Sequence, residues 1–159
     1  MTTTAIVQAR MSSSRLPGKV MQEIAGKPML VHVIERALRA NQVQAVWVAT
    51  TIDPSDDPIE ALCRSLKITC FRGSMHDVLD RYYQAAKAAR ADVVVRLTAD
   101  CPLLDPQLID ATIKAFQDGA DFAANRLPPP WTRSFPIGLD TEVCSFSALE
   151  LAWNEAKQP

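Results

Sequence analysis

The chain has 159 residues, of which 48% are hydrophobic and 22% are charged, a composition that is ordinary for a soluble globular protein. No apolar run is long enough to cross a bilayer, and the N-terminus lacks the basic start and apolar core of a secretory signal. We therefore expect a single domain over residues 1–159, located in the cytoplasm and with no membrane partner.

The net charge is −1, but the basic residues are concentrated near the N-terminus. Residues 1–27 carry four basic side chains against Glu23 alone, a net of +3, so the remainder carries −4. A local cationic segment on a mildly acidic protein indicates a small anionic ligand. It does not indicate a nucleic-acid partner, which would need a broader basic face.

In chain order, short apolar runs alternate with stretches of helical spacing. Continuous apolar runs of this kind are typical of strands that are covered on both faces. The predicted strands are 5–7, 45–49, 68–71 and 92–97, followed by weaker candidates at 121–124 and 141–144.

Helices are predicted in the gaps between these strands. The predicted starts at Ser74 and Ser147 are each followed three residues later by an acidic residue, as in a capping box. The alternation of strands and helices predicts βαβ units, hence an α/β fold with a mostly parallel sheet. The predicted helices begin at Pro28, Asp57, Ser74, Asp105 and Ser147.

The segment 8–19 directly follows the first predicted strand, and ligands of open parallel sheets bind at the carboxyl ends of the strands. It carries Arg10, Arg15 and Lys19 at spacings of five and four, which could neutralise a triphosphate. The segment is not a Walker motif, because it lacks the glycine spacing and the Lys-Ser/Thr pair. A solvated basic loop is the common alternative. The buried preceding strand and the lack of acidic partners favour phosphate binding.

Hydroxyl groups and backbone amides of the same segment would supply the short hydrogen-bond donors that phosphates need. The Pro17-Gly18 pair would bend the chain so that Lys19 turns back over the phosphates. Besides the three cations, the candidate ligand-binding residues of this segment are Gln8, Ala9, Ser12, Ser13, Ser14 and Gly18.

A second segment, 98–102, follows the fourth predicted strand and places Asp100 just beyond it. A carboxylate opposite a cationic phosphate loop suits Mg²⁺, which takes one or two carboxylates together with phosphate oxygens and water. An aspartate that only caps a turn is the alternative, whereas Asp105 is expected to cap the following helix. If both strands are central, the two segments meet in one crevice.

Several segments, taken together, resemble the sugar cytidylyltransferases, which include the acylneuraminate and 3-deoxy-manno-octulosonate cytidylyltransferases. The resemblance is greatest to the spore coat polysaccharide biosynthesis protein F branch, SpsF. It extends over essentially the whole chain, and the motifs are specific as a set. The matching segments are 6–10, 14–19, 25–28, 71–74, 77–83, 96–103 and 138–143.

The resemblance implies a Rossmann-like three-layer αβα nucleotide-diphospho-sugar transferase fold. It implies transfer of CMP from CTP to an acidic sugar, ulosonic or sialic acid-like, with release of pyrophosphate, in surface polysaccharide biosynthesis. It also implies that Arg10 and Lys19 hold the phosphates during catalysis and that Asp100 binds the Mg²⁺ cofactor. Charge neutralisation and positioning are what in-line attack at phosphorus requires.

Two departures from the family pattern leave alternatives open. The octulosonate branch has a glutamine near the base where this chain has Thr98. Thr98 is expected to bind the substrate, but a nucleotidyltransferase that uses GTP or UTP is one alternative. Relatives usually continue to a second metal aspartate, so the domain 1–159 is expected to be C-terminally truncated. A nucleotide-binding but catalytically silent domain is therefore another alternative, and a homodimer stays open. Asp140 is expected to line the sugar pocket or to close a turn.

The sequence predicts roles for three further side chains. Arg72, in a loop expected after a strand, is a candidate contact for the base or ribose. Arg81 lies one turn into a predicted helix and is expected to form a surface ion pair with Asp77 or Asp80. Trp131, in a proline-rich candidate lid, is a candidate stacking residue.

Overall fold

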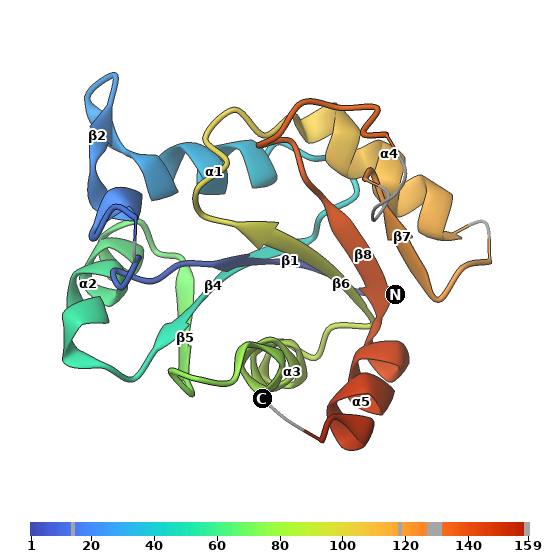
Figure 1. Ribbon diagram of the computed structural model, residues 1–159. Coiled ribbons are helices and arrows are strands. Elements are labelled where there is room, and N and C mark those ends of the chain that lie inside the picture. Colours follow the sequence, from blue (N-terminus) through green and yellow to red (C-terminus); the bar gives the residue numbers. More distant parts are fainter. Residues whose placement is uncertain (14, 118, 127–131, 158–159) are drawn as a thin grey trace.

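The computed structural model describes residues 1–13, 15–117, 119–126 and 132–157, and it contains a six-stranded sheet between two layers of helices (Figure 1). The order of the strands across the sheet is β5-β4-β1-β6-β8-β7. The strands are β1 (Thr3–Gln8), β4 (Ala45–Thr51), β5 (Thr69–Gly73), β6 (Val93–Thr98), β7 (Phe122–Ala124) and β8 (Glu142–Ser145).

The first four of these strands are parallel to one another, and β8 is antiparallel to both β6 and β7. The predicted mostly parallel sheet is therefore confirmed, and both weaker strand candidates are strands. Because β7 is antiparallel to β8, it runs in the same direction as β6. The segment that follows β7 consequently leaves the sheet at the same edge as the segments that follow β1 and β6.

Helices cover both faces of the sheet, so the predicted three-layer αβα arrangement is confirmed. The apolar residues of α1, α2 and α4 pack into one core with β1, β4 and β6, and those of α3 and α5 pack into a second core on the opposite face. None of the helices in the described part of the chain has the length and apolar character that crossing a membrane requires. The helices are α1 (Met29–Ala37), α2 (Asp57–Ser65), α3 (Val78–Ala88), α4 (Pro106–Gln117) and α5 (Phe146–Glu155).

Two helix starts differ from the prediction by the choice of capping residue. The N-cap of α3 is Asp77, whose carboxylate accepts from the Asp80 amide at 2.8 Å. Ser74 instead caps the preceding turn by accepting from the Asp77 amide at 3.1 Å. The N-cap of α5 is Ser145, not Ser147, because β8 ends there in an extended conformation that lets the hydroxyl accept from the Ala148 amide.

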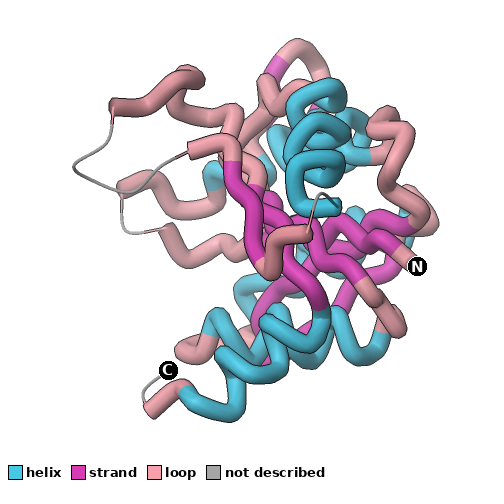
Figure 2. Tube along the Cα trace, turned by 90° about the vertical axis from the view of Figure 1, so that its right-hand side faces the viewer, coloured by secondary structure: helices cyan, strands magenta, loops and turns pink. Residues whose placement is uncertain are grey.

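Short elements that the sequence pattern did not predict follow the first loop. A 3-10 helix η1 (Lys19–Met21) leads into a small hairpin of β2 (Glu23–Ile24) and β3 (Lys27–Pro28). A second 3-10 helix, η2 (Pro54–Asp56), precedes α2. Figure 2 shows that the long loops gather at the side of the sheet away from the N-terminus, which is the carboxyl edge of the parallel strands.

Candidate active site

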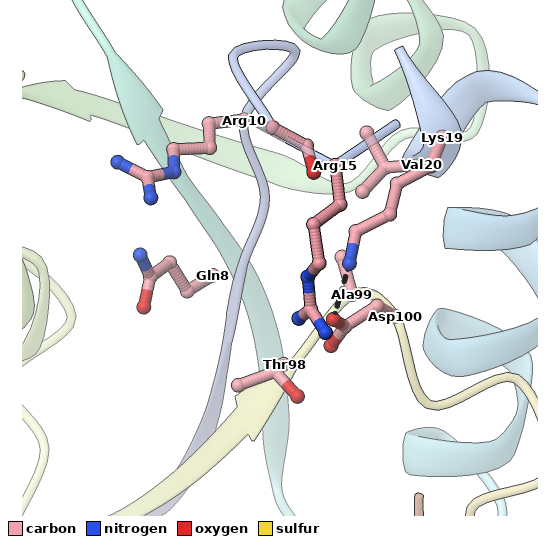
Figure 3. A pocket seen from close by; sticks show the side chains of 9 residues that line it. Gln8, Arg10, Arg15, Lys19, Val20, Thr98, Ala99 and Asp100 are labelled. Carbon is pink, nitrogen blue, oxygen red and sulfur yellow. Dashed lines mark hydrogen bonds and ion pairs between the residues drawn. The ribbon is translucent and has the colours of Figure 1, made fainter. Parts of the chain in front are cut away.

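The carboxyl ends of β1 and β6 are neighbours, since Gln8 pairs with Thr98 in the parallel register. The segments that follow these two strands line a cavity of about 240 Å³ (Figure 3). The structure thus brings the two predicted segments together in one crevice. The lining residues are Gln8, Arg10, Ser13, Arg15, Lys19, Val20, Thr98, Ala99 and Asp100.

Three cations and one carboxylate line this cavity, which gives it a net charge of +2. Arg15 and Lys19 point toward Asp100, whereas Arg10 extends away from it (Figure 3). Arg10 and Arg15 form no ion pair with any of the described residues. Two guanidinium groups are therefore available to an anionic ligand, and guanidinium groups bind phosphate oxygens through charge-assisted hydrogen bonds.

A buried aspartate anchors the loop after β1, residues 9–18, which we call the phosphate loop after its predicted ligand. Asp56, which is 1% exposed, accepts a hydrogen bond from the Met11 amide at 2.7 Å. The same carboxylate accepts from the Thr50 hydroxyl and from both the amide and the hydroxyl of Thr51, at the end of β4. The sequence pattern did not predict a role for Asp56. The sequence feature that could have indicated it is the run Asp56-Asp57-Pro58. Asp57 can begin the helix, which leaves Asp56 free to turn inward.

Gly18 turns the end of the loop toward the cavity. Its φ of 71° lies in the left-handed region, which glycine adopts without strain, and its amide donates to the Met11 carbonyl at 2.8 Å. Met11 is therefore fixed from two sides, by Asp56 and by Gly18. The turn starts η1, whose first residue is Lys19, so the predicted bend at Pro17-Gly18 is present and directs the lysine into the cavity.

Lys19 and Asp100 form an ion pair across the cavity, with Nζ 2.6 Å from Oδ2. Partial burial alone would raise the pKa of the Asp100 carboxyl. The hydrogen bonds from Lys19 and Thr98 outweigh that effect and lower its pKa below the ordinary value. Asp100 is consequently ionised at neutral pH and presents a hard anionic oxygen.

The turn after β6 is built on Thr98, whose hydroxyl lies 3.2 Å from the Cys101 sulfur. The Cys101 amide donates to the Thr98 carbonyl, which closes the turn around Asp100. Cys101 is buried, and burial raises the pKa of its thiol, so the thiol is protonated at neutral pH. Thr98 and Cys101 thus surround the Asp100 carboxylate, and a protonated thiol is a weaker nucleophile than a thiolate.

The small residues of the phosphate loop differ in burial and in whether they line the cavity. Ser13 lines the cavity, and its hydroxyl lies 3.4 Å from the Leu16 amide. Ser12 is exposed and does not line the cavity, and Ala9 is buried with its amide bonded to the Ala49 carbonyl. Ser14 lies outside the described residues. Phosphate contacts by these residues stay predictions.

Arg72 does not line the cavity. It lies on β5, where its guanidinium donates to the Thr51 and Asp53 carbonyls at 2.9 Å each. It also forms ion pairs with Asp57 at 2.7 Å and Glu60 at 2.9 Å. All three of its nitrogen atoms are therefore bonded within the protein. The predicted base or ribose contact stays a prediction that this geometry does not favour.

The prediction of a surface ion pair for Arg81 is wrong. The side chain is 0% exposed and forms no ion pair with a described residue. Its Nη1 donates to the Ser74 carbonyl, while Nε and Nη2 have no partner among the described atoms. Gly73 leaves the room for it, because a Cβ there would lie 3.3 Å from the Arg81 Cγ. Burial lowers the pKa of this guanidinium.

Asp140 is not among the residues that line the cavity, and it forms an ion pair with Arg133 across the 133–140 segment. Of its two predicted roles, closing a turn agrees with this contact, and lining a sugar pocket stays a prediction. Trp131, the predicted stacking residue, lies outside the described residues.

No group of three or more His, Cys, Asp or Glu side chains that could hold a metal is found in the described part of the chain. Asp100 is the one carboxylate among the described residues that line the cavity. A single ionised carboxylate facing cationic phosphate-binding groups still fits Mg²⁺, which completes its octahedron with phosphate oxygens and water. The donor set thus suits a metal that arrives with a nucleotide.

Comparison with known proteins gives the family. Residues 4–158 match the sequence model of the cytidylyltransferase family. The chain belongs to this family. It is 39% identical over 154 residues to an uncharacterised protein of Methanocaldococcus jannaschii, with 96% of this chain and 60% of the relative covered. It is 34% identical to the spore coat polysaccharide biosynthesis protein SpsF of Bacillus subtilis, with 91% and 59% covered.

A third relative is the 3-deoxy-manno-octulosonate cytidylyltransferase of Anaeromyxobacter sp., which is 39% identical over 77% of this chain and 50% of its own length. The chain thus spans between 50% and 60% of the length of these curated relatives. The resemblance to sugar cytidylyltransferases is confirmed at the level of the family.

Two solved structures share the fold. A cytidylyltransferase from Leptospira borgpetersenii has a TM-score of 0.91 at 33% identity and covers 100% of this chain and 66% of its own. CMP:2-keto-3-deoxy-manno-octonic acid synthetase complexed with CTP has a TM-score of 0.78 at 22% identity, with 99% and 80% covered. The second likeness concerns the fold alone.

Proposed function

We propose that this chain uses CTP to transfer CMP to the hydroxyl group of an acidic sugar, with release of pyrophosphate, in surface polysaccharide biosynthesis. The observation that carries the proposal is the cluster of Arg10, Arg15 and Lys19 facing Asp100 at the carboxyl edge of the sheet. The family match supports nucleotidyl transfer from CTP. The names of two relatives, SpsF and 3-deoxy-manno-octulosonate cytidylyltransferase, support a sugar acceptor.

In this reaction the acceptor oxygen forms a bond to the α-phosphorus as the bond between that phosphorus and the bridging oxygen breaks. Pyrophosphate leaves with the electron pair, and the hydroxyl proton passes to solvent. Negative charge grows on the leaving group, where Arg10, Arg15 and Lys19 would stabilise it. Asp56 and Gly18 hold the backbone of the loop that carries them before the nucleotide binds. Catalysis would thus rest on positioning and charge neutralisation.

Mg²⁺ is proposed as the cofactor, held by Asp100. Bound there, it would neutralise phosphate charge and lower the pKa of the attacking hydroxyl group. Lys19 forms an ion pair with Asp100 in this structure, so the carboxylate is already oriented toward the cavity. Asp100→Asn is expected to abolish the Mg²⁺ dependence of CTP binding in a calorimetric titration. An unchanged metal dependence would reduce Asp100 to a turn residue.

Thermal unfolding with Mg²⁺ and each of CTP, UTP, GTP and ATP tests the nucleotide. A ligand at a hundred times its Kd stabilises by roughly 2.7 kcal/mol, which raises Tm by about 5–10 °C for a domain of this size. We expect this shift with CTP and a smaller one with the other three. Stabilisation by GTP and not by CTP would overturn the choice of base. Pyrophosphate release with eight-carbon and nine-carbon ulosonic acids then tests transfer, and CTP binding without release would contradict it.

A further inference from the structure

A second cluster of charged side chains lies beyond the phosphate cavity, on the strands that continue the sheet. Arg96 and Glu142 are cross-strand partners of β6 and β8, and Arg96 Nη1 lies 2.7 Å from Glu142 Oε2. Arg126, just after β7, approaches the other oxygen of the same carboxylate at 3.4 Å. Two guanidinium groups therefore share one carboxylate, which leaves this trio with a net charge of +1.

Each of the two arginines has N–H groups besides those that contact Glu142. A guanidinium carries five N–H groups. The hydrogen bonds that these two make to described residues run from Nη1 of Arg96 and Nη2 of Arg126, and both end on Glu142. Their side chains are 39% and 47% exposed, so the remaining N–H groups can be reached by a ligand. Planar guanidinium groups of this kind bind carboxylates through two parallel hydrogen bonds.

Arg96 is also held in place by an aromatic ring. Its guanidinium carbon lies 5.6 Å from the centroid of the Tyr82 ring, within the range of a cation–π contact. Tyr82 itself is buried and its hydroxyl donates to the Leu97 carbonyl at 2.9 Å. Arg96 is thus oriented before any ligand binds, by Glu142 on one side and Tyr82 on the other.

Two adjoining hollows of about 500 and 310 Å³ share Arg96 as a wall, on the face of the sheet that α3 and α5 cover. The other walls of the larger hollow are mainly apolar and include Val94 and Leu149. Arg96 and Thr98 alternate to the same face of β6 and lie roughly 6.6 Å apart along the strand. Thr98 lines the cavity between the segments that follow β1 and β6, so a wall of the larger hollow lies two residues along β6 from that cavity. Apolar walls with a few convergent polar groups are typical of small-ligand sites.

We propose that Arg96 and Arg126, oriented by Glu142, bind the carboxylate of the acceptor and select acidic sugars over neutral ones. The inference rests on the proposed function and deepens it, because it assigns acceptor recognition to named residues. One carboxylate would bring the +1 trio to neutrality, whereas a neutral sugar would leave both guanidinium groups only partly paired. The sugar ring would lie against the adjoining apolar hollow.

Arg126→Gln tests this assignment, since Arg126 lies outside the strands and its exposed ion pair contributes little to folding. Arg64→Gln is the matched control, because Arg64 is also an exposed arginine in an ion pair, with Glu60 on α2, and lines none of these cavities. The assay is pyrophosphate release with CTP and Mg²⁺. The acceptors are 3-deoxy-manno-octulosonic acid and N-acetylneuraminic acid, each as the free acid and as the neutral methyl ester.

We expect the wild-type protein to prefer the acid over its ester. Arg126→Gln should raise KM for the acid at least tenfold, while the KM for CTP and the rate with the ester stay unchanged. A merely structural role would instead lower activity with acid and ester alike. Equal KM values for the acid in Arg126→Gln and Arg64→Gln would overturn the proposal, as would equal use of acid and ester by the wild-type protein.

Failure of this inference can be separated from failure of the proposed function. If CTP does not bind in a calorimetric titration, or binds without pyrophosphate release from any acceptor, the proposed function itself fails. If CTP binds but no acceptor is turned over, the same two acids are titrated into the CTP-bound protein. Binding that weakens in Arg126→Gln and persists in Arg64→Gln supports the carboxylate site. Absence of acid binding to the CTP-bound wild-type protein overturns it and leaves the nucleotide site untouched.

Discussion

The two halves of the candidate site hold their cations by different means. On the nucleotide side, formed by residues 8–19 and 98–101, the backbone of the phosphate loop is anchored to the buried carboxylate of Asp56. On the acceptor side, formed by residues 96, 126 and 142, two arginines are oriented through side-chain ion pairs that are partly exposed. One half thus depends on buried hydrogen bonds of the main chain, the other on contacts between side chains.

The difference has an energetic consequence. Removal of a buried carboxylate leaves the donors of its hydrogen bonds unsatisfied, and each unsatisfied donor costs about 1–3 kcal/mol. An exposed ion pair typically contributes about 0–1 kcal/mol. We therefore expect substitutions that disturb the nucleotide side to affect folding and binding together. Substitutions on the acceptor side should change specificity with little effect on stability.

Asp56→Ala should have the largest effect. It removes the acceptor of four hydrogen bonds, one from Met11 and three from the end of β4, so we expect a loss of about 3 kcal/mol or more of unfolding free energy. CTP affinity should fall as well, because the phosphate loop loses its anchor. Urea denaturation and calorimetric CTP titration measure the two effects.

Two comparisons sharpen this prediction. Asp57→Asn changes the neighbouring aspartate, which is largely exposed and pairs with Arg72, and should cost about 1 kcal/mol or less. Arg126→Gln on the acceptor side should be similarly mild. If Arg126→Gln destabilises the fold as much as Asp56→Ala does, the proposed contrast between the two halves is wrong.

Lys19→Ala comes next in size. Loss of a charge-assisted hydrogen bond to a phosphate should weaken CTP binding by roughly 1.5–3 kcal/mol, with a small effect on stability. Lys27→Ala is a suitable control, because Lys27 is also basic and close in sequence but pairs with Glu35 away from the cavity lining. Calorimetry with Mg²⁺ and CTP measures both variants. An unchanged affinity in Lys19→Ala would remove Lys19 from the site.

Gly18→Ala should cost about 1–2 kcal/mol of stability, because an alanine is strained at a φ of 71°. It should also weaken CTP binding, since the turn directs Lys19 into the cavity. Gly26→Ala imposes the same backbone strain at a φ of 80° in the β2–β3 hairpin and touches no cavity residue. We expect equal losses of stability in the two variants. CTP affinity should fall in Gly18→Ala alone. Equal affinities in the two variants would show that the turn does not position Lys19.

The sequence predicted the nucleotide side far better than the acceptor side. The strand-loop order and the spacing of Arg10, Arg15 and Lys19 are local features, and parallel strands bring loops at their carboxyl ends together. Asp56 escaped prediction because its partners, Met11 and the end of β4, become neighbours only when β1 pairs with β4. The Arg96–Glu142 pair depends on the antiparallel register of β6 and β8. Local spacing carries no information about such a register.

Arg81 also shows that local sequence spacing does not predict long-range contacts. Its position after Asp77 favours a surface ion pair on local grounds, yet α3 turns that face onto the sheet where Gly73 leaves room. Helical spacing predicts which residues share a face of the helix. It does not predict which neighbouring glycine allows a long cationic side chain to be enclosed.

The smallest expected effect concerns the ionisation of Asp100. Partial burial opposes ionisation, but the hydrogen bonds from Lys19 and Thr98 outweigh it, so the pKa in the folded protein lies below the ordinary value of 3.8. The ionised form therefore favours the folded state. This stabilisation is fully present above pH 3.8 and is lost as the pH falls through the lowered pKa. Because Asp100 is 40% exposed, the effect on unfolding is modest.

Asp100→Asn should therefore lose less stability than the wild-type protein between pH 5 and pH 2, as measured by thermal unfolding. Lys19→Gln should flatten the profile in the same direction, because it removes the cation that holds the carboxylate in its ionised form. The double variant should then show no further change, since the two substitutions remove one shared interaction. Additive changes would mean that Asp100 and Lys19 act independently, and the nucleotide side would then lack the pre-oriented pair that sets it apart from the acceptor side.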